Sequence, residues 1–254
     1  MKKKYPILEF DSKSRSMIDP SVFIKNRVKH ERCVITFFRN ALSDVVKRYN
    51  GTVIDSRCSE AGPLPVYQII YKRKKISLFF PGIGAPMAGG FFDELVALGF
   101  TKFIACGGAG VLDKKLCAGH IVVPVSAVRD EGTSYHYMPP SREVDAGKKG
   151  VEAIEKVLKR HKAEYVLGKT WTTDGIYRET INKIKKRRKE GCLTVEMEAA
   201  AFFAIAKFRG VEFAQMLYCG DDLSGEEWDS RGWQNNTTVR EKLLYLSIEA
   251  CLEI

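Results

Sequence analysis

Apolar residues along this chain occur in two patterns, short continuous runs and longer stretches with helical spacing. A continuous run puts apolar side chains on both sides of a strand, so it predicts a sheet that is covered on both faces. Helical spacing predicts the helices that provide this cover. The continuous runs predict strands over residues 53–54, 66–71, 76–80, 102–106, 121–128, 165–172 and 211–219, and residues 192–195 lead into the most apolar helix. The helical spacing predicts helices over residues 31–49, 91–98, 144–161, 197–208 and 238–252, and a basic helix that contains residues 183–189.

Two parts of the chain lack a clear pattern. Residues 1–30 show neither the strand pattern nor the helix pattern, and we expect them to be irregular. The segment between the first two predicted strands contains Pro63 and Pro65, and we expect it to be a loop. From residue 31 onwards, strands and helices alternate without a linker or an internal repeat. This alternation favours a single α/β domain over residues 1–254, built on a mixed sheet.

The segment 197–208 is the most apolar of the predicted helices, and its only charged residues are Glu198 and Lys207. A helix that is apolar nearly all round is a buried helix, and Gly210 is a typical helix end. We therefore expect Glu196 and Glu198 in its first turn, where the helix dipole favours a carboxylate but burial disfavours its charge. Two interpretations stay open. The carboxylates either cap the helix or face a cleft and bind hydroxyl groups of a polar ligand.

Two predicted strands are followed by glycine-rich stretches. Gly82 and Gly84 follow one of them, and Gly107 and Gly108 follow the next. A glycine-rich loop between a strand and a helix can hold an anion on its backbone N–H groups. The spacing is not that of the dinucleotide-binding fingerprint. Since ligands of open α/β sheets bind outside the carboxyl ends of the strands, both stretches are candidate binding segments.

Composition and charge narrow the class of protein. Hydrophobic residues make up 45% of the chain, which is typical of a globular protein, and no apolar run approaches the roughly 20 residues of a membrane span. The net charge is +10, and much of the excess lies in the basic runs 72–75 and 183–189. Without interleaved aromatic residues, these runs favour solvated surfaces over nucleic-acid binding. A basic field would still attract small anions such as phosphate.

Cysteine and histidine give no sign of a metal site. The chain has seven cysteines and four histidines, and neither type shows metal-ligand spacing. We expect reduced thiols, a cytoplasmic protein and no bound metal.

Several motifs, taken together, resemble the nucleoside phosphorylase family of the purine nucleoside phosphorylase and uridine phosphorylase type, which includes the methylthioadenosine/S-adenosylhomocysteine nucleosidases. The resemblance runs from residue 76 to about residue 223 and rests on the order and spacing of the motifs. They are the loop 82–84, the stretch 107–110, the segment 119–123 before the loop 129–137, the segment Val195-Glu196-Met197-Glu198, and the strand that ends at Asp221.

The resemblance implies a three-layer α/β/α sandwich with a central mixed sheet and cleavage of an N-glycosidic bond. By position, Glu198 would hold ribose hydroxyls and Met197 would pack beside the sugar. Asp221 would protonate the leaving base, and Tyr177 and Arg178 lie in the loop that contacts the base in relatives. The resemblance also implies a homo-oligomer, either a dimer or a hexamer, with no cofactor other than inorganic phosphate as co-substrate.

The sequence departs from the phosphorylase pattern where phosphate binds. Residues 7–21 lack the family's G-D-P-x-R motif, and Ala105 stands where phosphorylases have an arginine. The leading hypothesis is phosphorolysis of a purine or pyrimidine nucleoside to free base and ribose 1-phosphate. The alternatives are a nucleosidase that uses water and a non-catalytic nucleoside sensor. Cations for phosphate would have to come from other positions, of which the candidates are Arg39, Arg57, Arg129 and Arg178.

Overall fold

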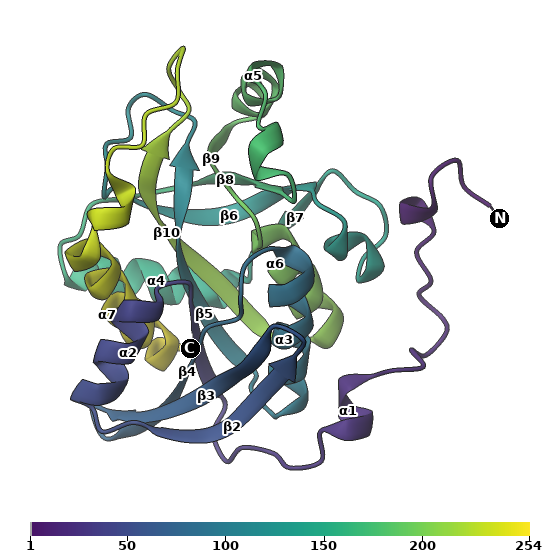
Figure 1. Ribbon diagram of the computed structural model, residues 1–254, viewed down its shortest axis with the longest axis vertical. Coiled ribbons are helices and arrows are strands. Elements are labelled where there is room, and N and C mark those ends of the chain that lie inside the picture. The colour runs from purple at the N-terminus through teal and green to yellow at the C-terminus, as the bar shows by residue number, and fades with distance from the viewer. Residues whose placement is uncertain (1) are drawn as a thin grey trace.

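The computed structural model describes residues 2–254, and its centre is a 10-stranded mixed sheet (Figure 1). The strands are β1 Arg32–Thr36, β2 Thr52–Ser59, β3 Gly62–Tyr71, β4 Lys74–Phe79, β5 Lys102–Val111, β6 Ile121–Asp130, β7 Glu143–Asp145, β8 Tyr165–Thr173, β9 Cys192–Glu196 and β10 Glu212–Asp222. The α-helices are α1 Pro20–Phe23, α2 Arg39–Arg48, α3 Ala85–Ala97, α4 Lys148–Arg160, α5 Ile181–Lys189, α6 Ala199–Arg209 and α7 Thr237–Glu253. Short 3₁₀ turns are η1 Pro6–Leu8, η2 Thr133–His136, η3 Ile176–Arg178 and η4 Trp233–Asn235.

Helices cover both faces of the sheet. In β5, Phe103 and Ala105 belong to the apolar core shared with α3 and α6, whereas Ile104 and Cys106 belong to the core shared with α2, α4 and α7. This alternation follows from the pleat of a strand, which points successive side chains to opposite faces. Figure 1 shows the two groups of helices on opposite sides of the sheet. The predicted α/β fold with three layers around a central mixed sheet is therefore confirmed.

The long strand β5 joins two parts of the sheet. Its first half pairs with β1, its last two residues pair with β9, and its whole length runs beside β10. The path from β10 through β6, β8 and β9 back to β5 therefore closes on itself. The predicted glycine-rich strand end at 107–110 is wrong in one respect, because these residues lie inside β5. Glycine permits close packing there, because a Cβ on Gly110 would lie only 2.5 Å from Leu223 Cδ1.

The predicted helix over residues 31–49 is wrong in its first third, which forms the central strand β1. Cys33, Val34 and Ile35 are fully buried, and they pair with β4 on one side and β5 on the other. The helical pattern arose because these residues precede the apolar positions of α2, such as Leu42 and Val45, at a compatible spacing. A strand that is buried on both faces has no period of its own to mark where it ends.

Three smaller predictions also need correction. Pro63 and Pro65 lie in β3 and pair with β2, which is possible because the register of β3 with β4 begins only at Val66. The predicted helix 144–161 begins at Lys148, after the short strand β7. The segment expected to be irregular contains the short turns η1 and α1. Within residues 2–254, no helix has the length and apolar character needed to cross a membrane.

A buried carboxylate, Glu249 of α7, connects three parts of the fold. It accepts hydrogen bonds from Tyr71 Oη at 2.9 Å, Lys72 Nζ at 2.7 Å, Arg160 Nη2 at 2.8 Å and His161 Nε2 at 2.9 Å. Burial alone would raise the pKa of Glu249, but the bonds from His161, Lys72, Tyr71 and Arg160 outweigh it and lower this pKa to about 2. The charge of Glu249 thus fastens α7 to the β3–β4 hairpin and to α4.

We expect Glu249→Gln to lower the free energy of unfolding by about 2 kcal/mol at pH 7, since it weakens several charge-assisted hydrogen bonds. A carboxyl whose pKa is lower in the folded protein stabilises the fold above its unfolded value of 4.5, and this contribution is lost as the pH falls towards about 2. The difference in urea midpoint should therefore shrink between pH 5 and pH 3. Glu241→Gln, which removes a more exposed pair with Arg48, is the control and should change little. Equal effects of the two variants would contradict the assignment.

Candidate functional site

The segment from Glu196 to Glu198 forms the junction between β9 and the buried helix α6. Glu196 is the last residue of β9 and pairs with Thr172 of β8, and Glu198 is the N-cap residue of α6, which begins at Ala199. The prediction that both carboxylates lie in the first helical turn is therefore wrong. The ladder with β8 keeps Glu196 extended, so the helix starts three residues later.

Glu196 is fully engaged with the protein. Its Oε2 accepts hydrogen bonds from the backbone N–H groups of Glu198 at 2.8 Å and Ala199 at 2.6 Å, and its Oε1 accepts one from Thr172 Oγ1 at 2.6 Å. Burial raises the pKa of Glu196, and these hydrogen bonds oppose the rise. The capping interpretation thus applies to Glu196, which holds the start of α6 and fixes the backbone of Met197.

Glu198 reaches across to a different segment. Its Oε1 accepts a 2.6 Å hydrogen bond from the N–H of Gly84, the N-cap residue of α3, and this leaves Oε2 available for a ligand hydroxyl. Only 6% of the residue is exposed. Burial raises the pKa of Glu198, and the neighbouring charge of Glu196 raises it further. The backbone of Gly84 has a φ of 89°, which glycine adopts without strain. One N–H group expected to hold an anion is thus occupied by the carboxylate itself.

The other glycines lie around this junction. Gly82, with a φ of 81°, has no room for a side chain, since a Cβ would lie 2.4 Å from Met87 Sδ. Gly107 and Gly108 lie in β5, after its register with β1 ends at Cys106 and before its register with β9 begins at Gly110. In the ladders of the described chain, residues 107–109 are thus paired with β10 alone. Gly108 is exposed at this gap, where a ligand can approach the backbone.

Asp221 lies at the end of β10, beside the same part of β5. Its Oδ1 is 3.6 Å from the position that a Cβ on Gly110 would take, and Gly110 pairs with Val195, the residue before Glu196. Its Oδ2 accepts a 2.7 Å hydrogen bond from Trp228 Nε1. The next residue, Asp222, has a different role, because it forms an ion pair with Arg231 at 2.5 Å.

The loop around η3 contributes residues near Asp221. Tyr177 is 94% exposed and Arg178 is exposed, so both side chains are accessible to a ligand. Glu179 is half-buried, and burial, followed by the charge of Asp221, raises its pKa to about 7. Its position near Asp221 was not predicted, because a single glutamate in a polar loop gives no sequence signal.

Glu131, on the loop after β6, is a further buried carboxylate that the sequence did not single out. Its Oε2 accepts a hydrogen bond from the N–H of Ser134 at 2.9 Å, and its Oε1 is buried without a partner among residues 2–254. Burial raises the pKa of Glu131, whose charge in turn raises the pKa of Glu196. The site is therefore surrounded by more carboxyl groups than its motifs indicate.

Of the four candidate cations, two are engaged in the fold. Arg57 pairs with Asp55 and Glu94, and Arg129 is 4% exposed and donates to Ser134 Oγ at 2.8 Å and to the carbonyl of Pro139 at 2.8 Å. The other two are exposed and form no ion pair with residues 2–254. They are Arg39 and Arg178.

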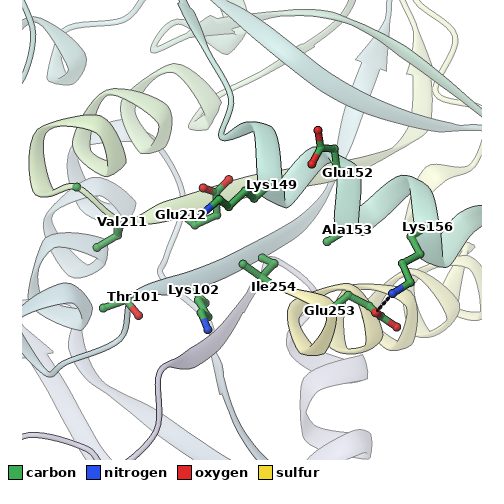
Figure 2. Close-up of a pocket in the computed structure, with 11 residues that line it drawn as sticks. Thr101, Lys102, Lys149, Glu152, Ala153, Lys156, Val211, Glu212, Glu253 and Ile254 are labelled. Carbon is green, nitrogen blue, oxygen red and sulfur yellow. Dashed lines mark hydrogen bonds and ion pairs between the residues drawn. The ribbon is translucent and has the colours of Figure 1, made fainter.

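A cavity of about 770 Å³ lies at the other end of β5 and β10, away from Asp221 (Figure 2). Its lining includes Lys102 and Glu212, the first residues of the parallel strands β5 and β10. Three of its charged side chains have partners at short distance: Lys102 with Glu31 at 2.8 Å, Lys156 with Glu253 at 2.5 Å, and Glu212 with the N–H of Gly150 at 2.8 Å. None of the residues that line this cavity belongs to the carboxylate site. No group of three or more His, Cys, Asp or Glu side chains within residues 2–254 is placed to hold a metal ion.

Comparison with known proteins identifies relatives over most of the chain. The family model of the phosphorylase superfamily matches residues 31–253. A DeoD-type purine nucleoside phosphorylase of Bacillus cereus is 28% identical over 191 residues, which cover 72% of this chain and 78% of that protein.

Two solved structures have a similar fold. The purine nucleoside phosphorylase from Toxoplasma gondii in complex with immucillin-H has a TM-score of 0.76 at 21% identity, over 87% of this chain and 90% of that one. The AMP nucleosidase from Bacteroides thetaiotaomicron has a TM-score of 0.71 at 20% identity, over 86% of each chain. At these identities the likeness concerns the fold alone.

We expect Glu198→Gln to stabilise the protein at alkaline pH. A carboxyl whose pKa is raised by folding stabilises the fold below its unfolded value of 4.5 and loses this contribution as the pH rises through the folded pKa. The variant cannot ionise, so its Tm should match the wild type at pH 5 and exceed it at pH 9 by about 2–4 °C for each kcal/mol of relieved charge burial. Glu60→Gln removes an exposed carboxylate and is the control. A variant less stable than the wild type at pH 9 would show that the ionised group holds the fold.

Proposed function

The chain belongs to the phosphorylase superfamily, and on that premise we propose that it is a nucleoside phosphorylase. Its reaction would be the reversible phosphorolysis of a purine or pyrimidine nucleoside to free base and ribose 1-phosphate. The observation that carries this proposal is the carboxylate of Glu198, which is buried at the N-terminus of α6 with one oxygen bound to Gly84.

The ribose would bind at Glu198, with Met197 beside the sugar. An ionised carboxylate accepts hydrogen bonds from a 2′,3′ diol, and it stabilises the positive charge that develops on the ribosyl group as the glycosidic bond breaks. Burial raises the pKa of Glu198. The diol and the developing cation would act in the opposite direction and favour its ionised form. Glu196 would hold the backbone at Glu198 in place, because its own oxygens are bound to the N–H groups of Glu198 and Ala199 and to Thr172.

The base would leave at Asp221. The bond between C1′ and the base nitrogen breaks, the proton of Asp221 passes to the base, and an oxygen of phosphate forms the new bond to C1′. A general acid of this kind contributes about 10²–10⁴-fold to the rate. Tyr177 and Arg178 are exposed in the loop that brings Glu179 near Asp221, and they would contact the base.

Phosphate would bind beside Arg39. The family match begins at residue 31, so its first elements are β1 and α2, and the segment 7–21 lies outside it. Arg39 is the first residue of α2 and lies 4.2 Å from the ring centre of Phe80, just before the Gly82 loop. Ala105 is fully buried in the core, so no cation can come from that position.

A second candidate is hydrolysis, with water as the nucleophile. It is favoured by the neutral Ala105 and by the Gly84 N–H group, which is bound to Glu198 rather than free for an anion. A non-catalytic sensor is less well supported, because binding alone does not require an acid at Asp221.

We expect base release to depend on phosphate. Arg39→Met should raise the KM for phosphate about 10- to 150-fold, since a charge-assisted contact is worth about 1.5–3 kcal/mol. Lys47→Met removes a positive charge from the other end of α2 and is the control. The measurement is the initial rate against phosphate concentration at constant ionic strength. A flat response with free ribose as product would establish a hydrolase, and no base release from any nucleoside would favour the sensor.

Asp221→Asn should slow cleavage of inosine or adenosine by about 10²-fold or more, because the leaving purine must be protonated. A nitrophenyl riboside, whose leaving group departs without a proton, should be affected far less. The comparison of kcat on the two substrates is the measurement. Equal losses would mean that Asp221 binds the sugar or holds the structure.

A further inference from the structure

We propose that Trp228 is a positioning residue for the leaving-group acid Asp221. This inference rests on the proposed function. The contact that carries it is the 2.7 Å hydrogen bond from Trp228 Nε1 to Asp221 Oδ2. The sequence did not single out Trp228, which lies in a polar loop without periodicity between β10 and α7.

The loop that carries Trp228 is fastened at several points. Asp222 and Asp229 exchange two backbone hydrogen bonds, of 2.7 and 3.0 Å. Arg231 pairs with Asp222 and also donates to the carbonyl of Leu116 at 2.9 Å. Arg188 of α5 donates to the carbonyl of Ser224 at 3.2 Å. These contacts return the chain from Asp222 to Asp229, so the residue before Asp229 is brought back over the end of β10.

The chemistry of the contact selects one oxygen of Asp221. An indole N–H can only donate a hydrogen bond, so it cannot take a proton from the acid. By donating to Oδ2, it favours the state in which the transferable proton resides on Oδ1. That oxygen faces β5, at 3.6 Å from the position that a Cβ on Gly110 would take. Trp228 thus orients the carboxyl group so that its proton points away from the loop.

Three kinds of charged group surround this contact. Glu179 approaches Asp221 from the loop before α5, and its pKa is raised by burial and by the charge of Asp221. Asp222 is the next residue and is paired with Arg231. Glu226 and Glu227 precede Trp228 in its own loop. Because Glu179 lies near Asp221 and its pKa is raised to about 7, the test is repeated with Glu179 replaced.

The test is Trp228→Phe, which keeps an aromatic ring and removes the N–H donor. We expect kcat on inosine to fall about 10-fold with little change in KM, and kcat on a nitrophenyl riboside to stay within about 2-fold, because only the first reaction needs the oriented proton. The same difference between the two substrates is expected when Glu179→Gln is present in both proteins.

Trp233→Phe, the same substitution in the same connection, is the matched control and should leave kcat on both substrates unchanged. If Trp228→Phe behaves like this control, or loses equal activity on both substrates, the positioning role is overturned while the proposed function stands. If the wild-type protein releases no base from any nucleoside, the proposed function is overturned and the role of Trp228 with it.

Discussion

The hydrogen bond between the Gly84 N–H and the Glu198 carboxylate ties together the two helices that cover one face of the sheet. Gly84 is the N-cap of α3 and Glu198 the N-cap of α6, so this carboxylate lies between two helix N-termini. Each N-terminus carries partial positive charge, which offsets part of the unfavourable burial of an anion. The position of the site and the packing of this face therefore depend on the same contact.

The two glutamates of the motif divide two tasks that one residue could not perform together. Glu196 uses both oxygens to hold the start of α6 and the side chain of Thr172. Glu198 uses one oxygen to reach Gly84. Because Glu196 fixes the backbone before the helix, Glu198 is oriented without further side-chain partners. A group that binds and releases a ligand must keep some hydrogen-bonding capacity unused, and the fixed neighbour makes this possible.

The sequence predicted the layers of the fold, because long apolar runs and helical spacing are local signals. For the site it offered candidates only. It failed at β1, whose buried residues Cys33, Val34 and Ile35 merge with the pattern of the next helix. It also could not identify the partner of Glu198, since Gly84 is 114 residues away in the chain. Glu179 and Trp228 were missed because single polar or aromatic residues in loops have no period. Their meaning comes only from the fold that brings them to Asp221.

The closure of β10, β6, β8, β9 and β5 has a consequence for association between molecules. A strand at the margin of a sheet offers unpaired backbone groups to another chain, whereas a closed ring of strands offers none. Within residues 2–254, the long strand left at a margin is β2, since the other marginal strand, β7, has three residues. In β2, Asp55 and Arg57 form an ion pair. These charges disfavour pairing of β2, the one long marginal strand of the described residues, with a strand of another molecule.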